Sequence, residues 1–352
     1  MRFYDAIQLD PSILKTTIHS AETTKGKHQL WLAMVVRALL LVAFATLLIG
    51  PVAPIFGPEN SCMAVGLFCI MLGLRFVDFG YCMTDALINL AASFLLLLFM
   101  PPLAVLVGPI PGVLVHFAAV FLLLVITSDR PEMGNGGLYT FAYILLSGNP
   151  VTGELLWKRA ALTAVGYVIC ALVYFLNHRS KNTGMRFHHL MSQFHLSKKK
   201  CRWQFQFSLG LSLILSLGAL LGLERAMWAG FACGSMLGCY SGISTVKERF
   251  WQRIVGVVIG STLFFVIYQL APPSMQGLFG PFGGFCLGFC TEYKYKTAMN
   301  CFGALMMATG LYGLHGSVLL RIVNNLLGAT FGFAFVFVYQ KLMDHFLEPV
   351  SE

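Results

Sequence analysis

Two arginines in strongly apolar stretches are the residues of this chain best suited to bind a charged ligand. Arg159 and Arg321 are each followed four positions later by a hydrogen-bonding residue, Thr163 and Asn325. Residues i and i+4 share one face of a helix, so each pair presents a guanidinium and a polar group together. A planar guanidinium can bind both oxygens of a carboxylate. We therefore predict that these four residues contribute to a site for organic anions.

Other ionisable residues in apolar stretches extend the candidate site. A charge inside a membrane costs about 3 kcal/mol or more, so Arg37, Asp85 and Lys158 need partners or a function there. Four of the five charges are positive, as an anion pathway requires. We include Arg37 and Asp85 among the predicted substrate-binding residues and expect Lys158 at the membrane interface. The alternative for the arginines is that they extend along their helices to the lipid headgroups.

The elements that position these residues are predicted to be membrane helices. The chain has 352 residues, of which 57% are hydrophobic and 11% charged, whereas soluble domains average about 25% charged residues. Apolar runs of about 20 residues recur between short charged or Gly/Pro-rich loops, which is typical of α-helical spans and not of a β-barrel. The predicted fold is an all-α integral membrane protein with no soluble domain.

The two halves of the chain repeat one pattern. Three matches occur in the same order: Met71-Leu72-Gly73 with Met236-Leu237-Gly238, Pro101-Pro102 with Pro272-Pro273, and Arg159-x6-Gly166 with Arg321-x6-Gly328. A duplication would give about 12 membrane helices as two six-helix repeats. The predicted domains are an N-terminal tail (1–29), a first membrane repeat (30–178), a basic connector (179–202), a second membrane repeat (203–341) and a C-terminal tail (342–352).

The Lys and Arg distribution predicts the orientation. The tails, the connector and the loops placed inside hold 19 Lys or Arg residues, against Arg225 alone in the loops placed outside. Positive loops stay in the cytoplasm, so we expect a multi-pass protein of the bacterial cytoplasmic membrane with both termini inside. The basic connector is expected to face anionic lipid headgroups. Residues 1–29 lack the pattern of a signal peptide and are expected to form a surface helix or a partly ordered tail.

No set of residues suggests an enzyme, a cofactor or a metal. The ten cysteines lie mostly in apolar runs without Cys-x-x-Cys spacing, so they are expected to pack as small hydrophobes. Four connector histidines, His178, His188, His189 and His195, have no carboxylate or cysteine beside them, which favours a solvated or headgroup-facing helix over a metal or pH-sensing site. Gly-x-Ser-x-Gly, His-Glu-x-x-His and Walker motifs are absent from the sequence. We also expect no nucleic-acid partner.

Several short motifs of the second half resemble a known family. They are Trp228-Ala229-Gly230 at a helix start, Arg253 with Gly256 and Gly260, and Arg321 with Asn325 and Gly328. Together they are similar to the fusaric acid resistance family of bacterial membrane proteins, also called aromatic acid exporters. The first half departs from the pattern, with Asp85, Ile88 and Ala92 in place of the second motif, and the large cytoplasmic region of bigger members is missing. The resemblance implies transport of organic, often aromatic, carboxylic acids.

Three functions stay open at this point. The first is a secondary transporter that exports aromatic or other organic carboxylate anions. The second is an anion channel or passive pore of the same architecture, since plant malate channels look related in helix pattern. The third is a membrane scaffold or accessory subunit that does not transport and works with a soluble partner through its basic connector. For any of the three, a homo-oligomer is possible. Coupling to protons needs a carboxylate or histidine within a membrane helix, and Asp85 is the acidic residue expected there.

Short helices give a second indication of where a ligand would bind. Apolar segments interrupted by glycine, at corresponding places in two repeats, tend to surround the substrate site of transporters. Helices near 63–74, 138–146, 226–241 and 297–313 fit this description. The alternative for the ladder Gly230-x3-Gly234-x3-Gly238 is close helix packing.

Overall fold

The computed structural model describes residues 3–192 and 194–346, and within these ranges it contains helices and no strands. It confirms the all-α membrane fold. Among the described residues, seven helical segments are long and apolar enough to cross a membrane: Thr24–Phe56, Met83–Val107, Pro109–Thr127, Gly153–His178, Lys199–Leu220, Ile243–Leu270 and Tyr293–Met343. The predicted C-terminal tail is described only to residue 346, and residues 347–352 lie outside the described ranges, as do residues 1–2 of the N-terminal tail.

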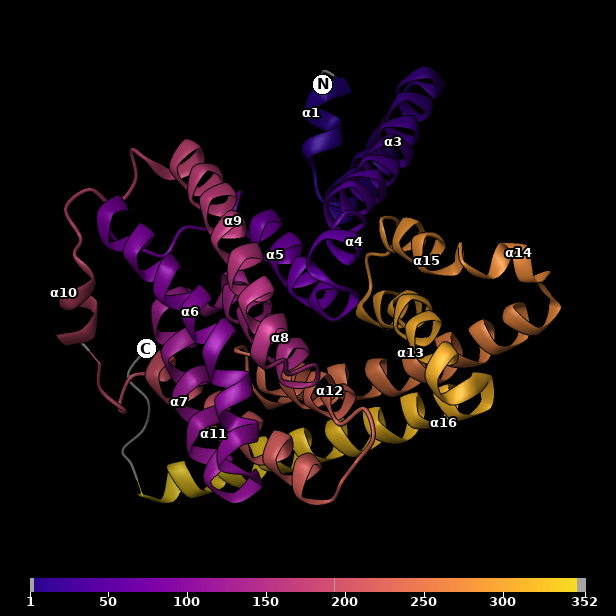
Figure 1. The fold of residues 1–352 in the computed structure, drawn as a ribbon. Coiled ribbons are helices and arrows are strands. Elements are labelled where there is room, and N and C mark those ends of the chain that lie inside the picture. Colours follow the sequence, from indigo (N-terminus) through magenta and orange to yellow (C-terminus); the bar gives the residue numbers. More distant parts are fainter. Residues whose placement is uncertain (1–2, 193, 347–352) are drawn as a thin grey trace. The chain divides into compact units, whose positions relative to one another are not determined.

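The helices occur in the order that the hydropathy pattern predicts (Figure 1), but one continues through Pro101 and Pro102 to Val107 and another already begins at Ile243. The first half contains α1 (Phe3–Gln8), α2 (Pro11–Ser20), α3 (Thr24–Ile49), α4 (Val52–Phe56), the 3-10 turn η1 (Pro58–Asn60), α5 (Ser61–Leu74), α6 (Met83–Val107), α7 (Pro109–Thr127), η2 (Pro131–Met133), α8 (Asn135–Ser147) and α9 (Gly153–His178). The connector contains α10 (Phe187–Ser192). The second half contains α11 (Lys199–Leu220), α12 (Met227–Leu237), α13 (Ile243–Leu270), α14 (Pro273–Gln276), α15 (Phe279–Leu287) and α16 (Tyr293–Phe346).

The last helical segment, α16, is two arms joined at a glycine. Gly313 has φ 67° and ψ 171°, a conformation that is not helical and that glycine adopts without a Cβ clash. This position is close to the break that the sequence predicts between helices at 297–313 and 318–340. The α16 segment therefore consists of two helices that meet at a kink at Gly313.

Three short helices pack on one another. A helix rises 1.5 Å per residue and a span needs about 20 residues, so α5, α8 and α12 are too short to cross alone. The α8 helix contacts both α5 and α12. A Cβ placed on Gly66 of α5 would lie 3.2 Å from the Cβ of Ala142, and one on Gly230 of α12 would lie 3.0 Å from Ile144. These glycines therefore allow close packing, which favours that alternative for the ladder in α12.

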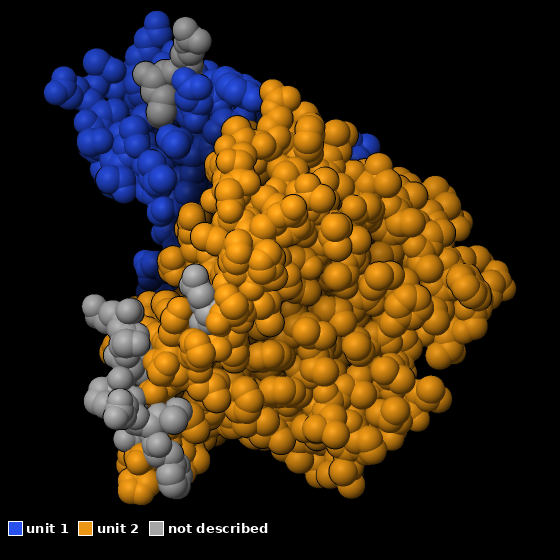
Figure 2. Space-filling model, turned by 90° about the vertical axis from the view of Figure 1, so that its left-hand side faces the viewer, with its two compact units in different colours: residues 1–47, 251–323 blue, residues 48–250, 324–352 orange. Residues whose placement is uncertain are grey.

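The chain forms two compact units, each of which takes segments from both halves (Figure 2). Unit 1 comprises Met1–Leu47 and Trp251–Val323, and unit 2 comprises Leu48–Phe250 and Asn324–Glu352. The units thus cut across the two predicted repeats, because α3 belongs with α13, α15 and the first arm of α16. The domain bounds expected from the sequence stay a prediction.

Unit 1 has an aromatic core and a separate N-terminal contact. Phe264 is fully buried, with its ring centroid 5.6 Å from that of Phe302 and 6.0 Å from that of Phe279. Near the N-terminus, Leu14 and Ile18 of α2 are buried with residues of α3 in a second apolar cluster. The predicted N-terminal helix therefore exists as α1 and α2, and the apolar side of α2 is covered by α3.

Candidate functional site

Arg159 lies in the interior of unit 2 and all three of its guanidinium nitrogens donate hydrogen bonds. Its side chain is 1% exposed. Nε donates to Oδ1 of Asn60 at 2.8 Å, Nη1 donates to the carbonyl of Asn149 at 3.0 Å, and Nη2 donates to the carbonyl of Glu59 at 3.0 Å. Nη2 also contacts the sulfur of Cys62 at 3.4 Å. The interior location is as predicted, but the donors are occupied by the protein itself.

The partners of Arg159 come from the ends of short helices. Asn149 lies two residues after the end of α8, next to the C-cap Gly148, and Glu59 and Asn60 form the turn before α5. Asn60 is fully buried and donates in turn to the carbonyls of Phe56 at 2.8 Å and Leu155 at 3.2 Å. We call this set, Arg159 with Glu59, Asn60 and Asn149, the α9 clamp. It joins the start of α5 and the end of α8 to α9.

Thr163 does not present its hydroxyl beside the Arg159 guanidinium. Its Oγ1 donates to the carbonyl of Arg159 at 2.7 Å, a bond within α9. Lys158, the neighbour of Arg159, lies where the sequence predicts, with 44% of its side chain exposed and an ion pair to Glu154 at 2.8 Å. Arg159 and Thr163 are thus buried and bonded within the protein, and the exposed Lys158 lies next to them.

Arg321 lies in unit 1 beside a second buried arginine. Its side chain is 5% exposed and hydrogen-bonds with Cys301, and its closest charged and phenolic neighbours include Arg253 and Tyr293. Arg253 is 8% exposed and donates from Nη1 to the hydroxyl of Tyr293 at 2.8 Å. We call Arg253 and Arg321 the arginine pair. Two like charges in a low-dielectric interior repel each other, so the pair creates a strongly positive point inside unit 1.

Two glycines of α13 bring the arginine pair together. A Cβ on Gly256 would meet the backbone of Lys294, and a Cβ on Gly260 would meet the backbone of Ala298. The α13 helix therefore crosses the first arm of α16 with almost no space between the backbones. Arg253 is one turn before Gly256, so it reaches Tyr293 at the start of α16. The Arg-x-x-Gly-x-x-x-Gly motif thus serves helix packing and positions its own arginine.

Asn325 is fully buried one turn beyond Arg321 on α16. Arg321 belongs to unit 1 and Asn325 to unit 2. The adjacent Asn324 donates to the carbonyl of Glu224 at 2.9 Å, in the turn before α12. This part of α16 therefore supports the start of a short helix, as Arg159 does in the first half.

Arg37 faces a carboxylate of the N-terminal segment. It is half-buried on α3 and interacts electrostatically with Asp10. Asp10 accepts hydrogen bonds from the backbone N–H of Ser12 at 2.8 Å and its hydroxyl at 2.6 Å. Burial pushes the pKa of Asp10 up, but the bonds from Ser12 and the positive charges of Lys296 and Arg37 lower that pKa below its usual value. The charge of Arg37 is therefore balanced within unit 1.

Asp85 is not well within a helix, which corrects the sequence-based expectation. It lies in the first turn of α6 and accepts hydrogen bonds from Nη1 of Arg186 and from the backbone N–H of Phe187, both at 2.9 Å. The apolar run begins at the start of this helix, so sequence alone placed the residue too deep. The carboxylate ties the connector to α6 and gives no proton-binding group inside the membrane.

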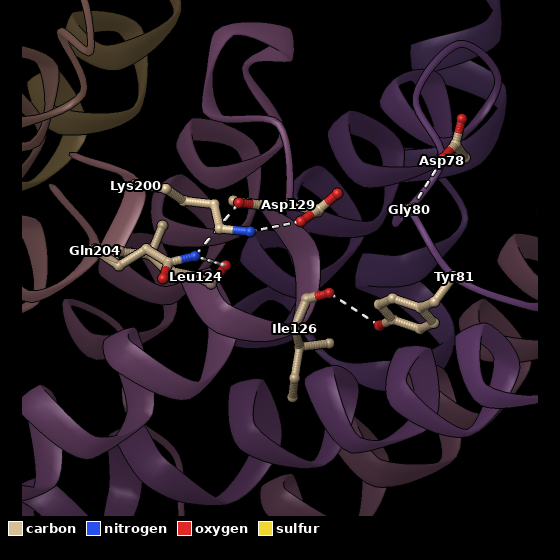
Figure 3. A network of polar contacts seen from close by, with 9 residues as sticks. Asp78, Gly80, Tyr81, Leu124, Ile126, Asp129, Lys200 and Gln204 are labelled. Carbon is tan, nitrogen blue, oxygen red and sulfur yellow. Dashed lines mark hydrogen bonds and ion pairs between the residues drawn. The ribbon is translucent and has the colours of Figure 1, made fainter. Parts of the chain in front are cut away.

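The connector is held by two further aspartates. Asp129 pairs with Nζ of Lys200 at 2.6 Å, next to the bonds from Gln204 to the carbonyl of Leu124 and from Tyr81 to the carbonyl of Ile126 (Figure 3). Asp78 accepts from the Nδ2 of Asn182 at 2.7 Å.

The histidines in and next to the connector lie in different surroundings. Over the described ranges, no group of three His, Cys, Asp or Glu residues could hold a metal ion. His178 is buried, with Nε2 2.7 Å from the carbonyl of Leu74. The rings of His188 and His189 lie 4.0 Å apart. The headgroup-facing role of this segment stays a prediction.

One buried histidine was missed by the sequence reasoning. His116 is 8% exposed within α7, and its Nδ1 lies 2.8 Å from the hydroxyl of Tyr143 on α8. The available signal is its position in the middle of an apolar run that contains no formal charge. Asn60 and Asn149 were missed for a different reason, since each lies in a turn whose partner is distant in sequence.

Comparison with known proteins finds a family match within the second half of the chain. Residues 212–335 match the model of a family described as fusaric acid resistance protein-like. The matched segment contains Arg253, Tyr293 and Arg321 and leaves out Arg159. It confirms the resemblance inferred from the motifs and supports a membrane transporter or resistance protein. No curated protein and no solved structure matches the chain.

Proposed function

We propose that this chain is a secondary transporter that exports aromatic or other organic carboxylate anions across a bacterial cytoplasmic membrane, with both termini inside. The observation that carries the proposal is the arginine pair, two buried guanidinium groups near each other within the family-matched segment. A carboxylate accepts charge-assisted hydrogen bonds at both oxygens. A bound anion would also relieve the repulsion between Arg253 and Arg321.

The surroundings of the arginine pair fit an aromatic acid. Cys301, the hydrogen-bonding neighbour of Arg321, is part of the apolar cluster that contains Phe264, Phe279 and Phe302. Tyr293 fixes Arg253 from the other side through its hydroxyl. The site therefore has a polar end for a carboxylate and an aromatic end, and aromatic rings attract one another by edge-to-face contacts.

The internal repeat belongs to the same proposal, with about 12 membrane helices as two six-helix units. Its support is a contact that recurs at one offset. A Cβ on Gly166 would meet Leu67, and a Cβ on Gly328 would meet Ala229. Both residues of the second contact stand 162 positions after those of the first (328 − 166 and 229 − 67). In each case the sixth helix of a repeat packs on the short second helix.

Transport by purified protein in liposomes tests the proposal. We expect wild type to exchange radiolabelled phthalate, an aromatic dicarboxylate, faster than malate, an aliphatic one. Arg321→Gln and Arg253→Gln remove charge-assisted hydrogen bonds, each worth about 1.5–3 kcal/mol, so the affinity for phthalate should fall roughly ten- to a hundredfold. Lys158→Gln, an exposed lysine outside the arginine pair, is the matched control and should transport like wild type.

Three results would count against this reading. Unchanged exchange by Arg253→Gln and Arg321→Gln variants that elute as single species from gel filtration would remove the arginine pair from the site. One-way phthalate flux that depends neither on an internal counter-substrate nor on a pH difference would instead identify a passive pore. Flux of neither phthalate nor malate by wild type would contradict transport of carboxylates altogether.

A further inference from the structure

The second feature that bears on transport is a buried histidine in unit 2, far along the chain from the arginine pair. His116 lies seven residues into α7, and its ring meets that of Tyr143 edge-on, with centroids 5.7 Å apart and an interplanar angle of 83°. Imidazole is the side chain that gains or loses a proton between pH 5 and 8 without help from its surroundings. A histidine inside a membrane helix is by default a functional candidate.

The tyrosine can serve both protonation states of His116. A neutral imidazole can accept a hydrogen bond at Nδ1 from the Tyr143 hydroxyl, and an imidazolium can donate from Nδ1 to the same oxygen. The 2.8 Å distance between Nδ1 and the hydroxyl suits either direction. Adding or removing a proton therefore needs a rotation of one hydroxyl and no movement of the helices.

A polar stripe on α11 faces the helix that carries this histidine. Its members recur every fourth residue and are all buried: Gln204, Ser208, Ser212 and Ser216. Gln204 donates to the carbonyl of Leu124 at 3.3 Å, and a Cβ on Gly112 would lie 3.9 Å from Oγ of Ser216. The stripe therefore runs along α7 on both sides of the His116 position. In this antiparallel register Ser212 lies at the level of the histidine.

One member of the stripe points to a ligand in its own right. Ser208 and Ser212 donate to carbonyls of their own helix, at 2.7 and 2.8 Å. Ser216 is 5% exposed, and its hydroxyl has no hydrogen-bond partner among the described residues. A buried hydroxyl without a partner costs about 1–3 kcal/mol, so this position suits a water molecule or a proton carrier next to α7.

Charged groups are remote from His116 along the helices packed around it. The titratable groups of α8 are Tyr143, which touches the ring, and Tyr139 one turn away. The α6 helix has Asp85 in its first turn, and α11 has Lys199, Lys200, Cys201 and Arg202 in its first turn. These first-turn groups of α11 lie at the Asp129 end of α7, to which Lys200 is paired. A rise of 1.5 Å per residue puts that end about 20 Å from His116.

We propose that His116 binds the proton whose movement drives anion export, and that the polar stripe of α11 conducts this proton along α7. The inference rests on the proposed transport function and supplies the coupling residue that Asp85 does not. One proton enters from one side of the membrane, is held on the imidazole as imidazolium, and leaves to the other side while one anion moves in the opposite direction.

Two transport measurements on the same liposomes separate coupling from anion binding. The first is phthalate exchange at equal pH on both sides, which needs no proton. The second is phthalate accumulation driven by a difference of one pH unit with the membrane potential clamped. For one proton per anion, that gradient supports about tenfold accumulation, since one pH unit is worth 1.36 kcal/mol. His116→Gln should keep exchange within about twofold of wild type and lose the accumulation.

Matched variants exclude a merely structural effect. His315→Gln replaces an exposed histidine of α16 and should accumulate phthalate like wild type. Tyr143→Phe keeps the ring and removes the hydroxyl, so it should shift the pH profile of accumulation while exchange persists. If His116→Gln does not elute as one species from gel filtration, the Tyr143→Phe variant tests the inference instead. An unchanged pH profile of phthalate accumulation in Tyr143→Phe would then overturn the inference.

The outcomes distinguish this inference from the proposed function. Equal accumulation by wild type and well-folded His116→Gln would overturn the role of His116 and leave anion exchange at the arginine pair intact. Wild type that exchanges neither phthalate nor malate would overturn the proposed function and this inference together.

Discussion

The surroundings of Arg159 and Arg321 differ although the two arginines occupy the same place in the repeated sequence pattern. The guanidinium of Arg159 donates hydrogen bonds to an amide oxygen and two backbone carbonyls, and none of these three acceptors is a carboxylate. Arg321 has a second guanidinium, that of Arg253, among its neighbours. The Arg-x6-Gly pattern therefore predicts that the arginine is buried and that its helix packs closely at the glycine. It does not predict which groups surround the guanidinium, and these groups differ between the two halves.

The turn before the short helix is held by different side chains in the two halves. In the first half, Nη2 of Arg159 donates to the carbonyl of Glu59, before α5. In the second half, Nδ2 of Asn324 donates to the carbonyl of Glu224, before α12, at 2.9 Å. An arginine therefore makes this contact in one half and an asparagine in the other.

The largest expected effect is on stability, from Arg159→Gln. The substitution leaves buried oxygens of Glu59, Asn60 and Asn149 without their charged donor, which costs about 3 kcal/mol or more. Thermal unfolding in detergent, followed by gel filtration, should show a clearly lower midpoint than wild type. Arg321→Gln should lose far less, because it also removes repulsion from Arg253. An Arg159→Gln variant as stable as wild type would erase the distinction between the two arginines.

A smaller effect separates the two glycines of the pattern. A methyl group on Gly328 would meet the backbone of Ala229, which cannot move aside, whereas one on Gly166 would meet the flexible end of the Leu67 side chain. Gly328→Ala should therefore destabilise by about 2–3 kcal/mol and Gly166→Ala by about 1 kcal/mol. The same thermal assay measures both. Equal costs would mean that the two helix contacts are alike after all.

The smallest expected effect concerns the tie between α6 and the connector. Arg186 is 56% exposed, so the ion pair with Asp85 is screened by solvent and contributes little. Asp85→Asn should shift the unfolding midpoint by less than roughly 1 °C and leave phthalate exchange unchanged. A double-mutant cycle with Arg186→Gln isolates the pair. Loss of transport in Asp85→Asn would place the coupling group in the first half at α6 instead of α7.

The sequence was sufficient for the helices and for the burial of the arginines. Apolar run length, loop charges and most Pro/Gly breaks indicate where helices begin and end, although α6 continues through Pro101 and Pro102. Recurrence of Arg-x6-Gly in both halves predicts an interior position for Arg159 and Arg321, which the structure confirms. The break near 313 was also visible, because Gly313 lies between two apolar runs.

The partners of the site residues were not accessible from the sequence. Asn60 and Asn149 are separated from Arg159 by different turns, and only the packing of α5, α8 and α9 brings them together. Asp85 was placed too deep because hydropathy marks the start of an apolar run and does not show that the connector folds back onto it. His116 was overlooked because formal charge was used to select candidates, and a neutral imidazole carries none.

The composition of unit 1 has a consequence for how this protein is made. The α3 helix, which ends at Ile49, packs against α15, where a Cβ on Gly288 would lie 2.6 Å from the Cβ of Ala38. About 230 residues separate these two helices in the chain (279 − 49). At a synthesis rate of about 5–20 residues per second, α15 is synthesised roughly 10–50 s after α3. During that time its apolar surface must be sheltered by lipid or by the insertion machinery, while most of unit 2 can already assemble.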